Sequence, residues 1–414
     1  MDISILHLVS LYYLIVFYGE QMKILHTIDL YYPYKGGAQE AILQISKRLV
    51  EHGHEVTIAT TRIPERTFDE HYGIKIEEFD ISGNFLKGYV GDVERYRSFL
   101  LDSDFDIIMN FSCCTWATDL LLPLMDSIAA KKVLTPCGFY TLYWPQYQEY
   151  YDLMKAAIPK FDCCIVMSES YRDTKFVKEH NGKYVVIPNG ADEREFLTPP
   201  SNNLIRKKLG IPEDHFLILL VGNHTGHKGH ADAIRIFKRA HITDATLLIV
   251  AGNVYGRVLG PLCNLNCMVQ KFLNRVNPFS RRSHKSILIE RLDREDVVQS
   301  YLSADLFLFP SMIECSPIVL FECLGSGTPF LVTDVGNARE IIGWTHAGEL
   351  LPTHYLKNGF CRVDVRQTVP QLEALIMDKE RLKKYSDNGF ASFKENFTWE
   401  KTAQKHEDLY RSLL

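Results

Sequence analysis

Two glutamates lie eight positions apart in an otherwise apolar segment, PSMIECSPIVLFECLGSGTPFLVTD, at residues 310–334. Glu314 comes just before a predicted helix, and Glu322 falls inside it. A core helix has no packing use for a carboxylate, and a solvated helix would carry fewer isoleucine, valine, leucine and phenylalanine residues. Carboxylates in such a setting can each accept charge-assisted hydrogen bonds from two neighbouring hydroxyl groups.

The residues between the two glutamates predict how the helix begins. Ser316 is a favourable N-cap residue, and Pro317 suits the first helical position. The backbone amides of Ile318 and Val319 would then lack acceptors within the helix and would lie at the positive end of its dipole. Such a helix start binds phosphate groups. A diphosphate there would have one glutamate on each side, which predicts a nucleotide sugar as the ligand.

Two glycine-rich loops follow predicted strands. In VGNHTGHKGH, Gly222 and Asn223 lie at the strand end, and Lys228 is placed where its ammonium group can meet a departing diphosphate. In YPYKGGAQE, Gly36 and Gly37 permit close backbone approach in the equivalent loop nearer the N-terminus. A glycine-rich loop after a strand is common, so these loops support the glutamate pattern without establishing a site by themselves.

The length and composition are those of a globular protein with two domains of ordinary size. The chain has 414 residues, of which 46% are apolar and 23% charged, and usual domain lengths make two domains the expectation. The net charge of −5 gives no electrostatic attraction toward nucleic acid. No nucleic-acid partner is therefore predicted.

The ten cysteines show no metal-ligand spacing. Adjacent pairs occur at 113–114 and 163–164, and Cys263 and Cys267 are four residues apart, with no Cys-x-x-Cys motif and no Cys/His set. We expect buried free thiols in a reducing cytoplasm. This spacing predicts no bound metal ion. No cofactor is expected either, because the nucleotide sugar is a substrate.

Short β-branched runs alternate with longer helical patterns from residue 22 onward. The runs are continuously apolar, as buried parallel strands are, and read KILHTID, VTIATT, DIIMNFS, KVLTP and CCIVMSE. Amphipathic segments such as 38–51 lie between them, which predicts an open α/β sheet covered by helices. We place this N-terminal, acceptor-side Rossmann-like domain at 22–198, because a polar break at 193–203 follows YVVIPNGAD.

A second α/β series predicts a C-terminal nucleotide-sugar-binding Rossmann-like domain at 199–392. Its strands read FLILLVGN, TLLIVAG, SILIE, DLFLFPS and PFLVTDVG, with helices at 228–241 and 293–304. The carboxyl ends of both sets of strands can face a central cleft, which is where ligands bind in doubly wound folds. A further predicted helix, within 393–414, follows this domain.

Two segments fall outside this alternation. Residues 1–21 are apolar, but the stretch is short for a membrane span and has Asp2 where a signal peptide would carry lysine or arginine. We expect an upstream start codon that the working protein does not use, with an N-terminal anchor as the alternative. Residues 254–285 contain a predicted helix at 262–273 and basic residues, which either contact anionic lipid or an acidic acceptor or belong to a solvated insertion.

These motifs resemble those of the retaining glycosyltransferases of family four (glycosyl transferases group 1), which have the two-domain GT-B fold. The specific part is the Glu-x7-Glu pattern of Glu314 and Glu322, with SP between them and GSGTP after them. IPNGAD at the domain junction, KGG near the N-terminus, Lys228 followed by glycine, and SADLFLFPS are supporting matches. The resemblance covers nearly everything from Met22 onward.

The resemblance implies a role for each matched residue. Glu314 would lie by the transferred sugar and Glu322 by the nucleotide ribose, and Lys228 would neutralise the diphosphate without a metal ion. Glu314 and Lys228 would be the catalytic residues. The helix within 393–414 would pack back on the N-terminal domain. The remaining donor contacts would come from Gly36, Gly37, Gly222, Asn223, Ser316, Pro317, Ile318 and Val319.

Two positions depart from the family pattern. Asn223 stands where members usually have arginine, five residues before the lysine, and His224 or His227 would partly supply the missing charge. The motif TPCGFY has Cys137 where many relatives have histidine, and a neutral thiol is a weaker hydrogen-bonding group.

We place the acceptor side of the N-terminal domain at Cys137, Gly138 and Tyr140. The aromatic segment at 139–151 is either an acceptor platform or packing. His26, at the end of the first strand, is predicted to be a core histidine rather than a ligand.

The implied function is transfer of a sugar from a UDP- or GDP-sugar to a hydroxyl group of a glycan or lipid-linked acceptor, with retention of anomeric configuration. The setting would be polysaccharide or lipopolysaccharide synthesis in the cytoplasm, with peripheral contact at the inner membrane. One alternative is a sugar-nucleotide epimerase of the same fold, which would isomerise the donor without releasing diphosphate. Another is a non-catalytic nucleotide-binding partner of a glycosyltransferase.

Overall fold

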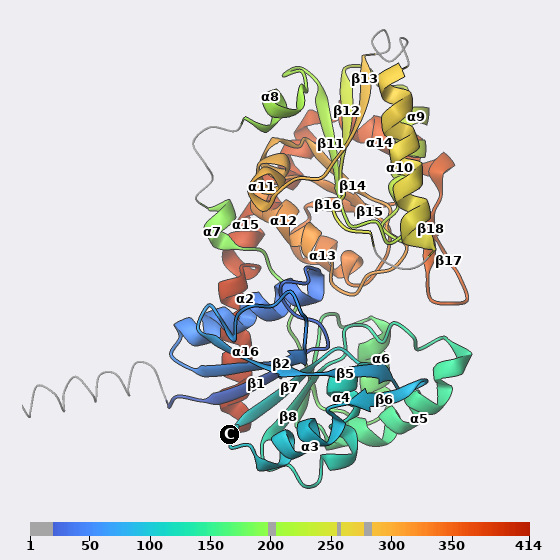
Figure 1. The fold of residues 1–414 in the computed structure, drawn as a ribbon. Coiled ribbons are helices and arrows are strands. Elements are labelled where there is room, and N and C mark those ends of the chain that lie inside the picture. Colours follow the sequence, from blue (N-terminus) through green and yellow to red (C-terminus); the bar gives the residue numbers. More distant parts are fainter. Residues whose placement is uncertain (1–19, 198–203, 255–257, 277–283) are drawn as a thin grey trace, which may run out of the picture. The chain divides into compact units, whose positions relative to one another are not determined.

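The computed structural model describes residues 20–197, 204–254, 258–276 and 284–414, in which the chain forms two compact units (Figure 1). Unit 1 holds the described residues up to Pro188 together with Trp399–Leu414, and unit 2 holds Asn189–Thr398. The division falls before the predicted boundary at 198/199. A physical reason is that the Asn189 side chain donates to the Ser316 carbonyl at 2.7 Å, so the junction already belongs to unit 2.

Unit 1 is built on an eight-stranded sheet in the order β10-β9-β8-β7-β1-β2-β4-β3. All neighbouring strands are parallel except β3 and β4. A separate antiparallel hairpin of β5 and β6 was not predicted. The strands are β1 Lys23–Thr27, β2 Glu55–Thr61, β3 Glu70–His71, β4 Ile74–Phe79, β5 Ile81–Asn84, β6 Gly88–Gly91, β7 Ile107–Phe111, β8 Lys131–Thr135, β9 Cys163–Val166 and β10 Tyr184–Val186.

The helices of unit 1 pair their buried faces with this sheet. In α2, for example, Ile42, Ile45 and Leu49 are buried, and they repeat at the three- and four-residue spacing of one helix face. The helices are α2 Gly37–Glu51, α3 Val93–Asp102, α4 Trp116–Asp119, α5 Gln148–Ala157, α6 Arg172–Glu179 and α16 Trp399–Leu413, with short 3-10 turns at Leu122–Leu124, Pro145–Tyr147 and Ile158–Lys160.

Helix α16 lies beside α2 in unit 1, although the two are far apart in the sequence (Figure 1). The Tyr410 hydroxyl lies 3.1 Å from His26 Nε2, and the other ring nitrogen of His26 lies 2.8 Å from the Ser46 hydroxyl. Burial lowers the pKa of His26 to about 3, so the ring is neutral. His26 is thus a core histidine with both nitrogens paired, as predicted.

Unit 2 is built on a six-stranded, all-parallel sheet in the order β13-β12-β11-β14-β15-β16. A small antiparallel hairpin of β17 and β18 follows it. The strands are β11 Phe216–Val221, β12 Ala245–Val250, β13 Lys285–Glu290, β14 Leu306–Phe309, β15 Phe330–Val332, β16 Gly348–Leu350, β17 Thr353–Tyr355 and β18 Cys361–Val363. The helices are α7 Glu193–Phe196, α8 Ile205–Leu209, α9 His230–Arg239, α10 Leu259–Val276, α11 Arg294–Ser303, α12 Ile318–Ser326, α13 Ala338–Thr345, α14 Val365–Met377 and α15 Lys379–Asn396.

The strand orders fix where each unit can hold a ligand. In each sheet, the strand that comes first in the sequence lies inside the sheet, and later strands are added on both sides of it. The strand order therefore reverses between β11 and β14 in unit 2 and between β1 and β7 in unit 1. Loops leaving the carboxyl ends of such strand pairs form the ligand crevice of doubly wound sheets. The prediction of two doubly wound α/β units is confirmed.

The predicted apolar extension at 1–21 lies almost wholly outside the described residues. Among the helices of the described part, none is long and apolar enough to cross a membrane. The helix predicted at 262–273 is present as the longer helix α10.

Candidate functional site

The loops after β11 and β14 bring Lys228 and Glu314 into direct contact. The Lys228 ammonium lies 2.7 and 2.9 Å from the two carboxylate oxygens of Glu314, and the Ser311 hydroxyl donates to the same carboxylate at 2.7 Å. The Lys228 side chain is 29% exposed and that of Glu314 only 10%. The two predicted catalytic residues therefore form one ion pair at the switch point of unit 2.

Glycines in the β11–α9 loop let it lie directly against the backbone that carries Glu314. Gly229 has φ +77°, and a Cβ atom there would lie 2.1 Å from the carbonyl oxygen of Pro310. A Cβ atom at Gly222 would lie 3.2 Å from the Lys228 side chain. The Met312 amide also donates to the His227 carbonyl at 2.8 Å. Glycine here allows two backbone segments to pack closely, while the approach of this loop to a diphosphate stays a prediction.

Helix α12 begins one residue later than predicted. It starts at Ile318, and Pro317 is the N-cap residue, without a side-chain cap hydrogen bond. Ser316 does not cap the helix, because its hydroxyl accepts from the Asn337 side-chain amide at 3.0 Å and from the Asn189 backbone amide at 3.4 Å.

The start of α12 still offers free donors. Ile318 and Val319 are the first two helical residues, and within the described part of the chain neither backbone amide has a recorded acceptor. Both residues are partly exposed. The predicted anion-binding helix start is therefore available on unit 2.

Glu322 has a charge partner that sequence analysis missed. The Arg294 guanidinium donates to one Glu322 oxygen, and its Nε donates to Glu195 at 2.9 Å. Glu322 is only 5% exposed, so this pair compensates a buried charge. The expectation that Glu322 has no structural use was wrong. Arg294 begins a separate helix, and no spacing in the sequence signals the pair.

Asn223 is held by the backbone. Its side-chain oxygen accepts from the Asn253 amide at 3.1 Å, which ties the end of β11 to the end of β12. Burial, followed by the nearby Lys228 charge, lowers the pKa of His227, so this ring does not supply the missing positive charge at neutral pH. His224 is buried and lies near cysteines of α10 instead.

In unit 1, the loop glycines Gly36 and Gly37 lie at the start of α2, with Gly36 as the N-cap residue. They follow β1, on one side of the switch point. Gly37 is exposed and Gly36 half-buried. The structure thus places them in a ligand-side loop of unit 1, while their contact with a donor stays a prediction.

The acceptor-side prediction falls on a strained loop after β8. Cys137, Gly138 and Phe139 have φ values of 55°, 85° and 42°, so three consecutive residues are left-handed. Such strain clusters at functional sites. The Gly138 amide donates to Asp173 at 3.0 Å, and burial raises the pKa of the Cys137 thiol, which stays neutral. Tyr140 is 42% exposed and lies edge-on to a neighbouring tryptophan ring.

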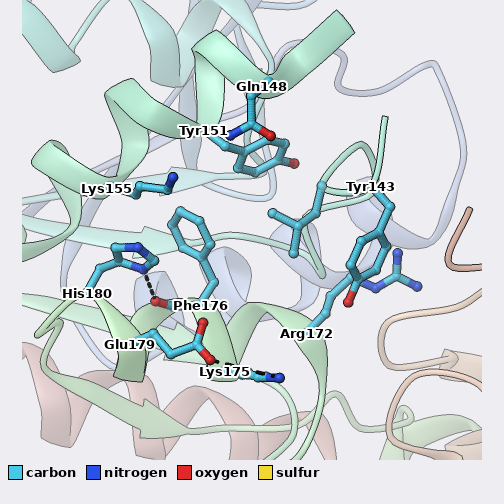
Figure 2. A pocket seen from close by; sticks show the side chains of 10 residues that line it. Tyr143, Gln148, Tyr151, Lys155, Arg172, Lys175, Phe176, Glu179 and His180 are labelled. Atoms are coloured by element: carbon cyan, nitrogen blue, oxygen red, sulfur yellow. Dashed lines mark hydrogen bonds and ion pairs between the residues drawn. The ribbon is translucent and has the colours of Figure 1, made fainter. Parts of the chain in front are cut away.

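A pocket of about 410 Å³ lies beside the aromatic segment of unit 1 (Figure 2). Figure 2 shows Tyr143 and Arg172 next to each other, and the guanidinium lies 5.3 Å from the ring centroid. The pocket contains none of the predicted site residues. In the aromatic segment at 139–151, Tyr150 is buried and Tyr143 is exposed. The segment therefore contributes both to the core and to the surface of unit 1. The lining is Leu142, Tyr143, Gln148, Tyr151, Lys155, Arg172, Lys175, Phe176, Glu179 and His180.

Asp119 is a second residue that sequence analysis missed. It ends α4, which follows β7 at the unit 1 switch point, and it accepts hydrogen bonds from the hydroxyls of Tyr89 and Tyr150 at 2.8 Å each. Burial raises its pKa to about 7 despite these two donors. A carboxyl group that titrates near neutrality is a candidate acid–base group, and only the fold reveals it.

Comparisons with known proteins agree with this geometry. Residues 201–389 match the family described as Glycosyl transferases group 1, and residues 35–195 match Glycosyltransferase Family 4. The chain is 23% identical to N-acetyl-alpha-D-glucosaminyl L-malate synthase of Bacillus anthracis, with 92% of this chain and 96% of the relative covered. It is 23% identical to lipopolysaccharide glucosyltransferase WaaG of Escherichia coli, with 88% and 94% covered.

Solved structures show the same fold at low identity. Sucrose-phosphate synthase from Thermosynechococcus elongatus superposes with a TM-score of 0.76 at 18% identity, covering 95% of this chain and 99% of that one. Anabaena HepE in complex with UDP and glucose gives a TM-score of 0.70 at 17% identity, covering 95% and 100%. The chain therefore belongs to the glycosyl transferases group 1, within glycosyltransferase family 4, and is a glycosyltransferase with the GT-B fold.

Proposed function

We propose that the protein transfers a sugar from a UDP- or GDP-sugar to a hydroxyl group of a glycan or lipid-linked acceptor, with retention of anomeric configuration. The observation that carries this proposal is the Lys228–Glu314 ion pair beside the start of α12. It combines a movable cation, a carboxylate and free backbone amides at one switch point. Solved relatives of the same fold contain UDP and UDP-glucose, which supports a nucleotide-sugar donor.

Donor binding would exchange the partners of Lys228. Without a donor, the ammonium group neutralises Glu314. A diphosphate at the start of α12 would attract the ammonium group and also accept from the backbone amides of Ile318 and Val319. Glu314 would then be free to accept hydrogen bonds from hydroxyls of the transferred sugar. Lys228 and the helix start would stabilise the charge that develops as the diphosphate leaves.

Retention is proposed to proceed by attack on the same face, assisted by the leaving phosphate. Glu314 is the carboxylate next to the expected sugar position. After Lys228 has turned to the diphosphate, the Ser311 hydroxyl would still donate to Glu314, and hydroxyls of the sugar would donate to it as well. A carboxylate that accepts from several donors is a weak covalent nucleophile. The oxygen of the departing diphosphate can instead accept the proton of the incoming hydroxyl group.

The transfer is proposed to need no metal ion at the reacting diphosphate. Lys228 and the amides of α12 would supply the positive charge that a divalent cation supplies elsewhere. Turnover should therefore persist in buffer without added Mg²⁺ or Mn²⁺. A requirement for either ion would contradict this part of the proposal.

The acceptor would bind on unit 1, near the strained loop at Cys137 and the pocket lined by Tyr143 and Arg172. An aromatic face can stack on a sugar ring, and a guanidinium group can bind an anionic group of a glycan or lipid headgroup. One relative named above is a lipopolysaccharide glucosyltransferase, which supports a glycan or lipid-linked acceptor.

Contact with a membrane would come through α10. Large apolar side chains line one side of this helix, including Leu262 and Leu265, each 55% exposed, and Phe272, which is 62% exposed. Cys267 and Gln270 on the other side are buried. A contiguous exposed apolar row on an amphipathic helix is typical of an interfacial membrane contact. We propose that this row lies in the headgroup region while the acceptor is processed.

The first test is calorimetric titration of the protein with UDP and with GDP. The wild type should bind one of them, and Glu322→Ala should weaken that binding at least tenfold, because the ribose contact would be lost. Lys383→Ala, an exposed lysine paired with Asp387 on α15, serves as the control. Absence of binding to both nucleotides would reject the donor site. Donor isomerisation without diphosphate release would favour the epimerase instead.

Membrane contact is tested by sedimentation with vesicles of phosphatidylethanolamine and phosphatidylglycerol. The wild type should sediment with the vesicles, and the double variant Leu265→Glu, Phe272→Glu should stay in solution. Met377→Glu, which changes an 82% exposed side chain at the end of α14, should behave as the wild type. Wild-type protein that stays in solution would reject the membrane proposal and leave the donor site untouched.

A further inference from the structure

We propose that His224, His230, Cys263 and Cys267 bind one zinc ion, which holds the β11–α9 loop of unit 2 against α10. Each residue offers one ligand atom, and the four atoms all lie within 4.8 Å of one another. The sequence predicts no metal ion, because these four residues show no Cys/His ligand spacing along the chain. The fold assembles a Cys/His set from two separate segments.

The spacing of the ligand atoms approaches that of a tetrahedral zinc site. Cys263 Sγ lies 3.3 Å from His230 Nδ1 and 3.5 Å from His224 Nδ1, and Cys267 Sγ lies 3.9 Å from His230 Nδ1. With Zn–S bonds of about 2.3 Å and Zn–N bonds of about 2.0–2.1 Å, neighbouring ligands of a tetrahedron lie about 3.3–3.8 Å apart. A zinc ion would need only small movements of these side chains.

The donor set selects zinc among common metal ions. Two thiolates and two imidazoles suit a borderline-soft ion, whereas magnesium and calcium require oxygen ligands. His230 and Cys267 are each 1% exposed and His224 is 4% exposed, while Cys263 is partly exposed. Four protein ligands complete a tetrahedron and leave no position for a substrate. A closed four-ligand site is structural rather than catalytic. The proposal therefore leaves the transfer reaction itself metal-independent.

The site would control the loop that carries Lys228. His224 follows β11, His230 is the first residue of α9, and Lys228 lies between them. The two cysteines are four residues apart on α10 and share one face of that helix. A zinc ion would therefore fix both ends of the lysine loop to α10. Only this consequence for donor binding rests on the proposed function.

The test measures metal directly. Protein purified without a polyhistidine tag and without chelators should contain about one zinc ion per chain by mass spectrometry. The double variant Cys263→Ser, Cys267→Ser should contain almost none. Cys163→Ser, which removes another buried thiol, in β9 of unit 1, should keep the zinc. After exchange with Co²⁺, the wild type should show tetrahedral d–d bands with sulfur-to-cobalt charge transfer, and the double variant should not.

Wild-type protein that contains no zinc and shows no such cobalt spectrum would overturn the proposal, and the four residues would be a hydrogen-bonded cluster only. If the double variant does not fold, a mercurial reagent added to the wild type gives the answer. Modification of the thiols should release zinc, and zinc that stays bound would count against these ligands. Zinc binding without UDP or GDP binding would reject the donor site and leave the zinc site standing.

Discussion

The Lys228–Glu314 pair is held by residues that have no charge of their own. Ser311 donates to Glu314, and the glycine at position 222 leaves room for the lysine stem. Because the pair lies at the rim of unit 2 rather than in its core, its partners can change when a diphosphate arrives. Two residues that are 86 positions apart in the sequence therefore form one functional pair.

Replacing Lys228 by alanine should lower kcat by roughly 100- to 1,000-fold, the usual loss when one donor to a developing charge is removed. Glu314 would also lose its counter-ion. The measurement is release of nucleoside diphosphate with a saturating acceptor. Lys383→Ala is the matched control, and near-normal turnover of Lys228→Ala would contradict the assigned role.

Asp119 predicts a pH dependence of stability. Its folded-state pKa of about 7 lies above the ordinary value near 3.8, so the folded state holds the proton more tightly. Its contribution to stability is therefore greatest below about pH 4 and falls as pH rises through 7. Each pKa unit corresponds to about 1.4 kcal/mol, so this contribution is on the order of a few kcal/mol.

The variant Asp119→Asn removes this titration. The difference in melting temperature, variant minus wild type, should therefore be more positive at pH 8 than at pH 5. Asp162→Asn, a partly exposed aspartate of the same unit, serves as the control. A difference between variant and wild type that is equal at both pH values would exclude Asp119 as the titrating group.

At the residue scale, local pattern predicted some of the site and not the rest. Glu314 and Lys228 stand next to motifs, so the sequence revealed them. Arg294 became a partner of Glu322 only because α11 and α12 pack together. Ser316 looked like an N-cap, but Asn337 from the next helix engages its hydroxyl. Tertiary contacts of this kind leave no periodic trace in the sequence.

At the scale of elements, the parallel strands were the most predictable part of the fold. Continuous apolar runs such as the one in β11 are required where helices cover both faces of a sheet. The region of β3 to β6 was not predicted, because its strands are two to six residues long and contain few buried residues. The grouping of imidazoles and thiols around α10 also depends on packing between elements.

The β11–α9 loop gives a prediction at this scale. Gly229→Ala would add a Cβ atom 2.1 Å from the Pro310 carbonyl oxygen at a φ of +77°, so the loop and Lys228 must shift. Donor affinity should fall about tenfold or more by calorimetry. Gly210→Ala is the matched control, because its φ is +67° but nothing lies within 4 Å. It should lose only the cost of a left-handed backbone, about 1–2 kcal/mol of stability, and keep donor affinity.

At the scale of the whole molecule, unit 1 is completed by a helix from the far end of the chain. Glu407 of α16 lies 2.7 Å from His52 and 2.8 Å from Arg411, and His54 is 3.2 Å away. Hydrogen bonds to Arg411 and the histidines outweigh burial and lower the pKa of Glu407. Hydrogen bonds to Glu400 and Glu407 likewise outweigh burial and raise the pKa of His52.

These two shifts define a pH window for the docking of α16. Glu407 stabilises the folded state above its ordinary pKa near 4.5, and this is lost as pH falls through its lowered value. His52 stabilises the folded state below 6.5, and this is lost as pH rises through its raised value. The contact between Glu407 and His52 therefore stabilises the folded state most between about pH 4.5 and 6.5.

The variant Glu407→Gln should cost about 1–3 kcal/mol near pH 6, the range for hydrogen bonds between charged groups. The loss should be smaller at pH 8.5. Hydrogen exchange of the backbone amides of α2 and α16 measures this loss of stability in unit 1. Asp408→Asn on the exposed side of the same helix is the control. A loss of stability that is equal at pH 6 and pH 8.5 would show that the charge on His52 does not stabilise the docking of α16.

The return of α16 to unit 1 has a consequence for how the chain is made. The strands and helices up to Pro188 leave the ribosome first, yet Tyr410, the buried partner of His26, is synthesised only after the whole of unit 2. Unit 2 is continuous in sequence and can fold as soon as it emerges. Until α16 is made, the surface of α2 that it will cover stays exposed to solvent. A chain that ends at Thr398, directly before α16, would therefore keep a complete unit 2 and still present an unfinished unit 1 to chaperones and proteases.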